Sequence, residues 1–439
     1  MIGSGIFMSP QFVMSNVGSP GASLIIWAVC GLVTICAALT YAELSTIFRE
    51  SGGQFIYILR LYGPLPAFFV SFTVIIVLKP SSIAAVSLSF AQYVVAPFYP
   101  DCMPPTLVVK CIAAVAILVV AIVNMLNVRF AMAIQTIFLV AKTLGLIVIM
   151  TAGILIIAKN GLENLDSDIA FEGTTLGLSS LGMALYQGLW SFSGWNNLAV
   201  VLEEVNLPRA LMIAIPVVTI FYLLVNISYL VVLTPREVMM SSAVAVTWGS
   251  KVLGSWGWVM SIAAALSSFG TLNGSFFGGG RITFAAAREG HMPSILSMAH
   301  VRCLTPSPAL TFTTIIAFIV LIPGNFRGIV NYLSFTSWFF NGLTISGLIY
   351  LKIRNSDLPH TYKVPIFIPI LALMASVFLV LAPIVDKPQI EYLYATIFIL
   401  SGTLIYIPFI HFKLCPHLLE KVTVFLQLFL EVAPAEKNM

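Results

Sequence analysis

The strongest constraint on this chain is a succession of apolar segments, each about as long as a lipid bilayer is thick. A helix needs about 20 apolar residues to cross the hydrocarbon core. Eleven segments reach that length, and 59% of the 439 residues are hydrophobic while only 9% are charged. The predicted spans are residues 22–45, 64–97, 105–127, 130–158, 177–204, 209–233, 254–283, 306–324, 328–352, 364–384 and 389–412.

The sequence therefore predicts an all-α, polytopic membrane protein with a single bundle of helices. A shorter apolar piece precedes the eleven full spans. We expect residues 1–412 to form the transmembrane bundle and residues 413–439 to form a cytosolic C-terminal helix and tail. In that tail Val422, Phe425 and Phe429 recur at three- and four-residue steps, which is typical of an amphipathic helix on a membrane surface.

Basic residues are unevenly divided between the two sides of the predicted bundle. With the N-terminus in the cytosol, thirteen lysines and arginines lie in cytosolic segments or at the cytosolic ends of spans, and six lie on the extracellular side, while Lys79 and Lys142 lie well inside spans. Lysine and arginine favour the cytosolic loops of membrane proteins. Both termini are therefore predicted to be cytosolic.

The predicted spans lack the combinations of residues that catalysis needs. Four of the five histidines lie in predicted loops or in the tail, His411 lies at the very end of the last predicted span, and the six cysteines show no CxxC spacing. No constellation of His, Asp and Glu is available within the spans for acid/base or metal chemistry. We predict that the protein is not an enzyme, needs no metal or other cofactor, and binds no nucleic acid.

Glycine and serine interrupt the apolar sequence at its start. The stretch Ile2-Gly3-Ser4-Gly5 releases backbone N–H groups just before a helix resumes at Ile6. Unwound backbone in a membrane is tolerated where it lines a cavity, and the N-terminus of a helix attracts a carboxylate. The structural alternative is that these small residues let membrane helices pack closely.

A second interruption lies within the predicted span 177–204. Ser191, Ser193 and Gly194 break an apolar helix just after Trp190. Two interrupted helices, five spans apart, are what an inverted repeat of five plus five helices predicts for a secondary transporter. The pair favours a substrate site formed by both breaks.

Several long motifs resemble one known family, the light subunits of heteromeric amino acid transporters. This family is the L-type branch of the amino acid, polyamine and organocation superfamily. The resemblance covers nearly the whole chain and is greatest to the cystinuria-type and cystine/glutamate-type members. The motifs are GSGIF at 3–7, YAELSTIFRESGG at 41–53, GWNNLAVVLEEVNLPRA at 194–210, AVAVTWGSKVLG at 243–254 and AAAREGHMPSILSMAHVRCLTPSPAL at 285–310.

The resemblance implies a LeuT-like fold of twelve spans, with a 5+5 inverted repeat in which helices 1 and 6 are broken. The opening fragment then corresponds to only part of the first span. The resemblance also implies sodium-independent exchange of amino acids by alternating access at the plasma membrane. A single-span glycoprotein heavy chain, joined by a disulfide, is the implied partner.

Cys102 is the residue that the resemblance gives to that disulfide, because in the family the cysteine of this loop pairs with the heavy chain. Cys102 lies in the segment PFYPDCMPP, between the spans 64–97 and 105–127. In the predicted topology it is the only one of the six cysteines in an extracellular loop. The oxidising exterior permits a disulfide there.

Lys142 lies well inside a span, in the segment FLVAKTLGLIV. A lysine at the centre of a span costs about 2.5 to 3.5 kcal/mol on insertion scales, so it should face a partner inside the bundle. In sodium-coupled relatives a cation lies between the first and eighth helices, and the resemblance implies that a lysine of the fifth helix replaces it. The alternative is a structural lysine that hydrogen-bonds helix carbonyls.

Further candidate substrate-binding residues lie at the second break. Trp190 occupies the position of the family's aromatic gate. Ser193 occupies the position where the cystinuria-type member, which imports cationic amino acids, has an aspartate. Because a buried cation without a facing carboxylate is disfavoured, we predict neutral substrates, aromatic or cystine-like ones included, with cationic substrates as the alternative. Asn196 and Trp338 are further candidates, although a tryptophan in a membrane bundle more often packs or anchors an interface.

Two other functions remain open from the sequence. A channel would also be polytopic and contain glycine breaks, but it should show a repeated filter, whereas these breaks are paired and unequal. Family members have half a helix before the GSG motif, and this sequence starts at Met1. An inactive, truncated isoform is therefore the second alternative.

Overall fold

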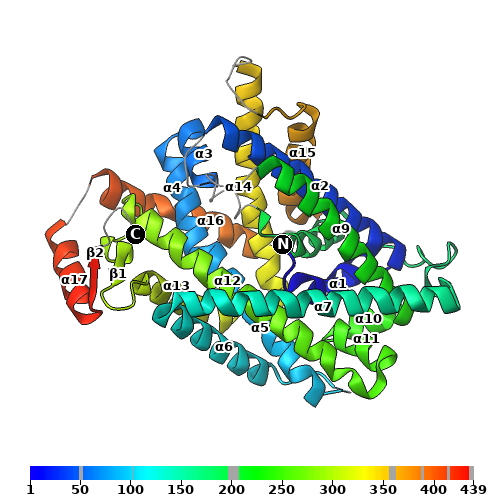
Figure 1. Ribbon diagram of the computed structural model, residues 1–439. Helices are drawn as coiled ribbons and strands as arrows, with labels where there is room; N and C mark the ends of the chain where they lie inside the picture. Colours follow the sequence, from blue (N-terminus) through cyan, green and yellow to red (C-terminus); the bar gives the residue numbers. More distant parts are fainter. Residues whose placement is uncertain are drawn as a thin grey trace.

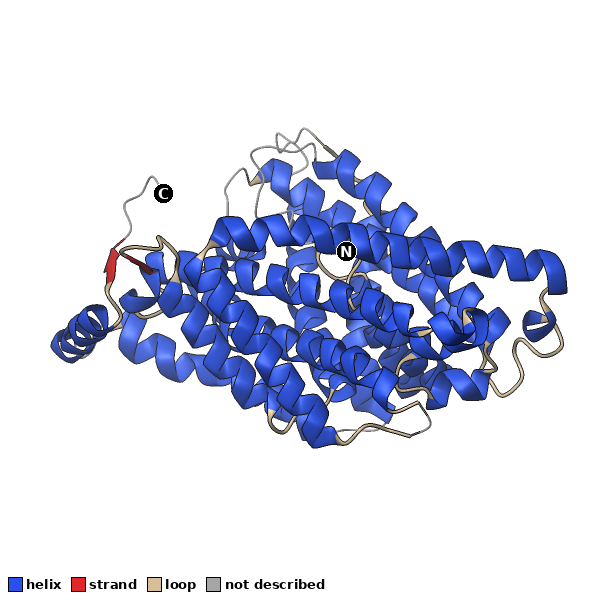
Figure 2. Cartoon of the chain, turned by 60° about the horizontal axis from the view of Figure 1, so that its bottom comes forward, coloured by secondary structure: helices blue, strands red, loops and turns tan. Residues whose placement is uncertain are grey.

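The computed structural model describes residues 1–48, 53–100, 102–195, 207–354, 362–386, 390–412 and 416–434. These residues form a predominantly helical bundle (Figure 1, Figure 2). Seven helical stretches in the described ranges are long and apolar enough to cross a membrane. They are Pro20–Ile47, Pro64–Phe98, Thr106–Leu126, Val128–Asn160, Pro208–Val232, Phe367–Val385 and Tyr392–His411.

The helices follow the predicted spans, with boundaries that differ by a few residues. The longer helices are α1 (Gly5–Val17), α2 (Pro20–Ile47), α4 (Pro64–Thr73), α5 (Lys79–Val95), α6 (Thr106–Leu126), α7 (Val128–Asn160), α8 (Leu178–Ser191), α9 (Leu207–Val232), α12 (Trp258–Arg288), α13 (Ser307–Leu321), α14 (Phe326–Arg354), α15 (Phe367–Asp386), α16 (Ile390–Ile405) and α17 (Pro416–Phe429). Shorter helices are α3 (Gln54–Tyr62), α10 (Pro235–Met240) and α11 (Val244–Val252), and π-helical turns follow α4 (η1, Val74–Leu78) and α16 (η7, Tyr406–His411). Single 3-10 turns are η2 (Ala96–Phe98), η3 (Glu163–Leu165), η5 (Gly254–Trp256) and η6 (Ser294–Ser297).

Helices α12 and α14 are also long enough to cross a membrane, at 31 and 29 residues. They are less apolar than their neighbours because they carry buried polar residues. Ser267, Ser268 and Asn273 of α12 and Thr344 of α14 are all buried. A membrane bundle accommodates such residues by turning them towards other helices and away from lipid.

Two groups of helices make up the bundle. In the first group, α1 packs against α8, and α2 packs against α8 and α9. In the second group, α5, α6, α12 and α13 pack against one another. The long helix α7 contacts α9 of the first group and α12 of the second, so it connects them (Figure 1). This division, with α1 and α8 in one group, agrees with the predicted LeuT-like fold.

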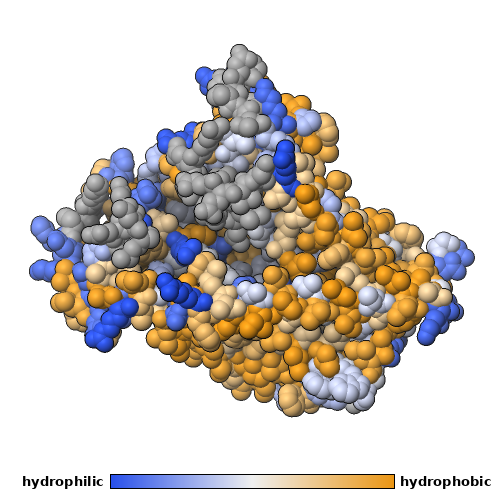
Figure 3. All heavy atoms as spheres, viewed as in Figure 1, coloured by the Kyte–Doolittle hydropathy of each residue, from blue (hydrophilic) through white to orange (hydrophobic). Residues whose placement is uncertain are grey.

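The outer surface of the bundle is apolar. Leu118 and Ile122 of α6 are 46% and 52% exposed, and Leu144 and Leu155 of α7 are 58% and 63% exposed. Figure 3 shows a broad hydrophobic face with hydrophilic residues gathered at its margins. Large exposed apolar areas of this kind are found where a protein meets lipid, so the surface fits a multi-pass membrane protein.

A buried ion pair joins α2, α14 and the segment just before α15 at one end of the bundle. The Nζ atom of Lys352 on α14 lies 2.8 Å from Oε2 of Glu43 on α2, and Glu43 is fully buried. The backbone N–H of Val364, just before α15, donates to the same Glu43 oxygen over 3.1 Å, and Lys352 donates to the Val364 carbonyl. The buried carboxylate of Glu43 is therefore bound both by the Lys352 ammonium and by the Val364 N–H.

Helices α10 and α11 pack against α1. Helix α10 begins with a capping box, in which the Thr234 hydroxyl accepts from the Glu237 N–H and the Glu237 carboxylate accepts from the Thr234 N–H. The ammonium of Lys251 lies 2.6 Å from the Glu237 carboxylate, and this hydrogen bond lowers the pKa of Glu237. The two short helices are thus held to each other as well as to α1.

A two-stranded sheet, which the all-α prediction did not include, lies near the end of the chain. Strand β1 (Met298–His300) pairs antiparallel with β2 (Val432–Pro434) (Figure 2). Three-residue strands show no clear alternation, so the sequence gives no signal for them.

The predicted C-terminal helix forms as α17. Leu426 and Leu430 pack towards the bundle, while Phe425 and Phe429 are 67% and 74% exposed. The amphipathic character of α17 and its position on a membrane surface stay predictions. Residues 413–415 and 435–439 of the tail lie outside the described residues.

Candidate functional site between two broken helices

Helix α1 begins at Gly5, directly after the predicted first break at Ile2-Gly3-Ser4. Ser4 occupies the N-cap position, yet its side chain makes no capping hydrogen bond. Ser4 is also only 2% exposed, so this helix end lies inside the bundle. An uncapped N-terminus directs its first N–H groups and the positive end of the helix dipole into the space in front of it.

The second predicted break coincides with the end of a helix, and the segment where the helix should resume lies outside the described residues. Helix α8 ends at Ser191, and the N–H groups of Phe192 and Ser193 donate to the carbonyls of Leu189 and Trp190, each over 3.1 Å. Gly194 follows with φ +104°, a conformation that favours glycine. Asn196 lies outside the described residues.

The two breaks are in direct contact. A Cβ atom added to Gly5 would lie 2.5 Å from Oγ and 2.6 Å from Cα of Ser191, so only glycine fits there. The N-terminal end of α1 therefore lies beside the C-terminal end of α8. The first end carries a partial positive charge and the second a partial negative charge, a combination that can hold both charged groups of a zwitterion.

Lys142 reaches the unwound backbone before α1 from helix α7. Its Nζ atom donates to the carbonyl of Ile2 over 2.8 Å, and the Ser267 hydroxyl of α12 donates to the carbonyl of Gly3 over 3.4 Å. The prediction that Lys142 faces a partner inside the bundle is therefore confirmed. Both roles considered for it, replacement of a cation and structural support of carbonyls, are compatible with this geometry.

The remaining predicted site residues differ in their surroundings. Trp190 is half-buried and packs against the main core, whereas Ser193 is exposed in the turn after α8. Trp338 is buried in the main core on α14, and no hydrogen bond or ring contact joins it to the described residues of either break. Trp190 and Ser193 therefore lie at the end of α8, whereas the contacts of Trp338 are packing contacts within the main core.

Two tyrosines that were not predicted from the sequence hydrogen-bond the backbone at the two helix ends. The hydroxyl of Tyr222 on α9 donates to the Ser191 carbonyl over 2.8 Å and lies 3.3 Å from the Met1 carbonyl. The hydroxyl of Tyr93 on α5 donates to the Phe7 carbonyl over 2.5 Å. A tyrosine inside an apolar span is the only signal for such a role, and it is a weak one.

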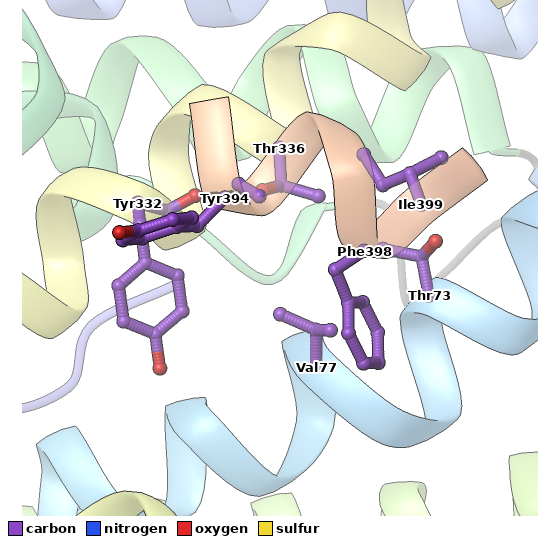
Figure 4. A pocket seen from close by; sticks show the side chains of 8 residues that line it. Thr73, Val77, Tyr332, Thr336, Tyr394, Phe398 and Ile399 are labelled. Atoms are coloured by element: carbon purple, nitrogen blue, oxygen red, sulfur yellow. Dashed lines mark hydrogen bonds between the residues drawn. The ribbon is translucent and has the colours of Figure 1, made fainter. Parts of the chain in front are cut away.

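A separate apolar cavity of about 270 Å³ lies between η1, α14 and α16 (Figure 4). Its lining includes no residue of either break, so it is distinct from the candidate site. The lining residues are Thr73, Val77, Tyr332, Thr336, Tyr394, Ala395, Phe398 and Ile399.

Cys102 is exposed in the loop between η2 and α6, where a partner protein can reach it. Cys111, near the start of α6, is exposed as well. Among the described residues, no group of three or more His, Cys, Asp and Glu side chains could hold a metal ion.

Two broken, abutting helices inside a bundle with an apolar exterior define a secondary transporter. The chain belongs to the amino acid permease family, whose model matches residues 1–409. It is 46% identical to the human b(0,+)-type amino acid transporter 1, over 100% of this chain and 91% of that protein. It is 38% identical to the human cystine/glutamate transporter, over 100% and 89% of the two chains. It is 39% identical to the human large neutral amino acids transporter small subunit 2, over 89% and 74% of the two chains.

These relatives confirm the resemblance to the light subunits of heteromeric amino acid transporters. The family consists of transporters, which agrees with the prediction that the chain is not an enzyme.

Proposed function

We propose that this protein exchanges neutral L-amino acids across the plasma membrane, independently of sodium, as the light subunit of a disulfide-linked heterodimer. The observation that carries the proposal is the contact between Gly5 and Ser191, which brings the ends of two broken helices together. A substrate that has one negative and one positive group at fixed separation matches these two ends.

The substrate's backbone groups are bound by backbone groups of the protein. The uncapped N–H groups around Ser4 and Gly5, preceded by the unwound residues Ile2 and Gly3, bind the carboxylate. The carbonyls at the end of α8 accept hydrogen bonds from the substrate ammonium, and Trp190 closes over the bound molecule. Asn196 and Trp338 are proposed as further parts of the pocket wall.

Lys142 takes the place of a transported cation in this proposal. Its ammonium contacts the unwound backbone from the direction of α7, and Ser267 of α12 contacts the next carbonyl. A fixed ammonium can hold the broken helix in position through every transport cycle, which removes the need for sodium.

The neutral preference rests on Ser193. A serine hydroxyl offers no charge to a cationic side chain, and a desolvated, unpaired cation loses several kcal/mol. The second candidate function is an exchanger that also accepts cationic amino acids, and the 46% identity to the b(0,+)-type transporter favours it.

Alternating access is the proposed mechanism. The group that contains α1, α2, α8 and α9 rocks against the group that contains α5, α6, α12 and α13, so that the zwitterion faces one side and then the other. Exchange becomes obligatory if the empty carrier reorients slowly. Both chain termini are proposed to be cytosolic.

Counterflow in proteoliposomes tests the proposed function. Vesicles preloaded with unlabelled leucine should take up labelled leucine faster than empty vesicles, because exchange speeds reorientation, and replacing sodium by choline should leave the rate unchanged. Arginine should inhibit at least about tenfold less potently than leucine, which corresponds to about 1.4 kcal/mol. Equal potency of arginine would exclude the neutral preference, and equal uptake by loaded and empty vesicles would indicate a pore.

Replacing Cys102 with serine should abolish a covalent heterodimer. The exposed thiol of Cys102 lies in a loop that we propose to be extracellular, where it can form a disulfide with a heavy chain. In cells that co-express a single-span glycoprotein heavy chain, the heterodimer band on a non-reducing gel should disappear in Cys102→Ser. It should persist in Cys111→Ser, the control with another exposed thiol. A band that survives Cys102→Ser would contradict this assignment.

A further inference from the structure

The hydroxyl of Tyr222 lies at the point where the two breaks meet. Tyr222 is on α9 and is fully buried. Its hydroxyl oxygen is 2.8 Å from the carbonyl of Ser191, the last residue of α8, and 3.3 Å from the carbonyl of Met1 in the unwound segment before α1. One side chain therefore contacts the backbone of both broken helices.

Packing fixes the Tyr222 ring. The Trp27 ring of α2 lies against it edge-on at a centroid distance of 5.7 Å, and the Phe192 ring lies against it at 4.9 Å. Phe192 is the first residue after α8, so the ring contacts the break itself as well as a neighbouring helix. These ring contacts on two sides hold the Tyr222 side chain in place, so its hydroxyl stays beside the Ser191 and Met1 carbonyls.

We propose that Tyr222 is a positioning residue for the substrate site. A phenol has a single proton to donate, so its bond to the Ser191 carbonyl fixes the end of α8 relative to α9, with the Met1 carbonyl as a second, longer contact. The carbonyls that we assign to the substrate ammonium belong to this helix end. The tyrosine thus sets the geometry of the ammonium site without touching the substrate, and this part of the inference rests on the proposed function.

The variant Tyr222→Phe removes the hydroxyl and keeps the packed ring. Tyr229→Phe is the matched control, because Tyr229 lies two turns further along α9, is 1% exposed, and has a hydroxyl without a hydrogen-bond partner among the described residues. In leucine exchange we expect KM to rise about three- to tenfold in Tyr222→Phe, with kcat changed less than about twofold, as loss of one hydrogen bond to a binding group predicts. Tyr229→Phe should match the wild type.

Hydrogen–deuterium exchange gives a second readout that does not depend on transport. Peptides that cover residues 185–195 should exchange faster in Tyr222→Phe than in the wild type and in Tyr229→Phe, because the end of α8 has lost its tether. Faster exchange confined to this region, with an unchanged melting temperature, supports the inference.

Three outcomes overturn the inference: unchanged exchange in residues 185–195, an unchanged KM in a protein that does exchange leucine, or a melting temperature lowered so far that exchange rises throughout the bundle. If the wild type does not exchange amino acids, the proposed function fails, and the deuterium measurement alone decides the role of Tyr222.

Discussion

Replacing Lys142 with methionine is expected to reduce amino acid exchange about 10- to 150-fold, which is the effect of losing one charge-assisted hydrogen bond of about 1.5 to 3 kcal/mol. Methionine has a similar length and removes only the donor to the Ile2 carbonyl. The unwound segment before α1 then lacks its contact with α7. Initial rates of leucine counterflow measure the effect.

A matched control is available in Lys110. Its Nζ atom donates to the Ile322 carbonyl over 2.6 Å, at an exposed position away from the breaks. Lys110→Met removes the same kind of bond and should leave exchange within about twofold of the wild type, since exposed interactions of this kind contribute little. Lys142→Arg, which retains the charge, should retain more activity than Lys142→Met.

The two roles considered for Lys142 predict different results. If Lys142 replaces a cation, exchange in Lys142→Met falls by far more than the melting temperature implies, and the residual activity becomes sensitive to monovalent cations. A purely structural lysine predicts a lowered melting temperature and an activity that follows the fraction of folded protein. Wild-type exchange in Lys142→Met would contradict both roles.

Replacing Gly5 with alanine is expected to reduce exchange about 100-fold. The added Cβ would lie 2.6 Å from the Cα of Ser191, about 1 Å inside normal contact distance, and the obstacle is backbone that cannot rotate away. The ends of α1 and α8 must therefore move apart. A displacement of about 1 Å in a site that binds both ends of a small substrate can lower its rate by about two orders of magnitude.

Gly278→Ala serves as the control for this substitution. Gly278 lies in the middle of α12, and a Cβ there would meet no heavy atom within 4 Å. Alanine is the better helix former by about 1 kcal/mol, so the variant should be at least as stable as the wild type and transport normally. The double variant Gly5→Ala, Ser191→Gly should recover little, because the backbone contact remains. Normal exchange by Gly5→Ala would show that the two helix ends need not touch.

Local sequence patterns predicted most of the helices, including the start of α1 at Gly5 and the end of α8 at Ser191. Glycine and serine weaken a helix locally, at their own positions. The effect of Gly3, Gly5 and the run from Ser191 to Gly194 can therefore be predicted from the sequence alone. Lys142 was predictable for a different reason, since the cost of a charge in lipid forces it towards the bundle interior.

Contacts between distant segments could not be predicted in the same way. The partner of Lys142 is Ile2, 140 residues earlier, and the acceptor of Tyr222 is Ser191, on another helix. Such pairs depend on how helices are placed side by side, and a hydroxyl within an apolar span leaves the hydrophobic pattern intact. The sheet formed by β1 and β2 was not predicted either, because its three-residue strands show no clear alternation and are more than 130 residues apart in the sequence.

The buried pair of Glu43 and Lys352 limits where this molecule can bend. Separating the two side chains would strand a carboxylate in protein interior, at a cost of about 3 to 5 kcal/mol. While the ion pair is intact, α2 cannot tilt away from the C-terminal end of α14. The segment before α15 is bound to the same carboxylate through the Val364 N–H. We therefore expect the pivot of the rocking motion to lie elsewhere along α14. The C-terminal end of α14, which carries Lys352, should then move together with α2.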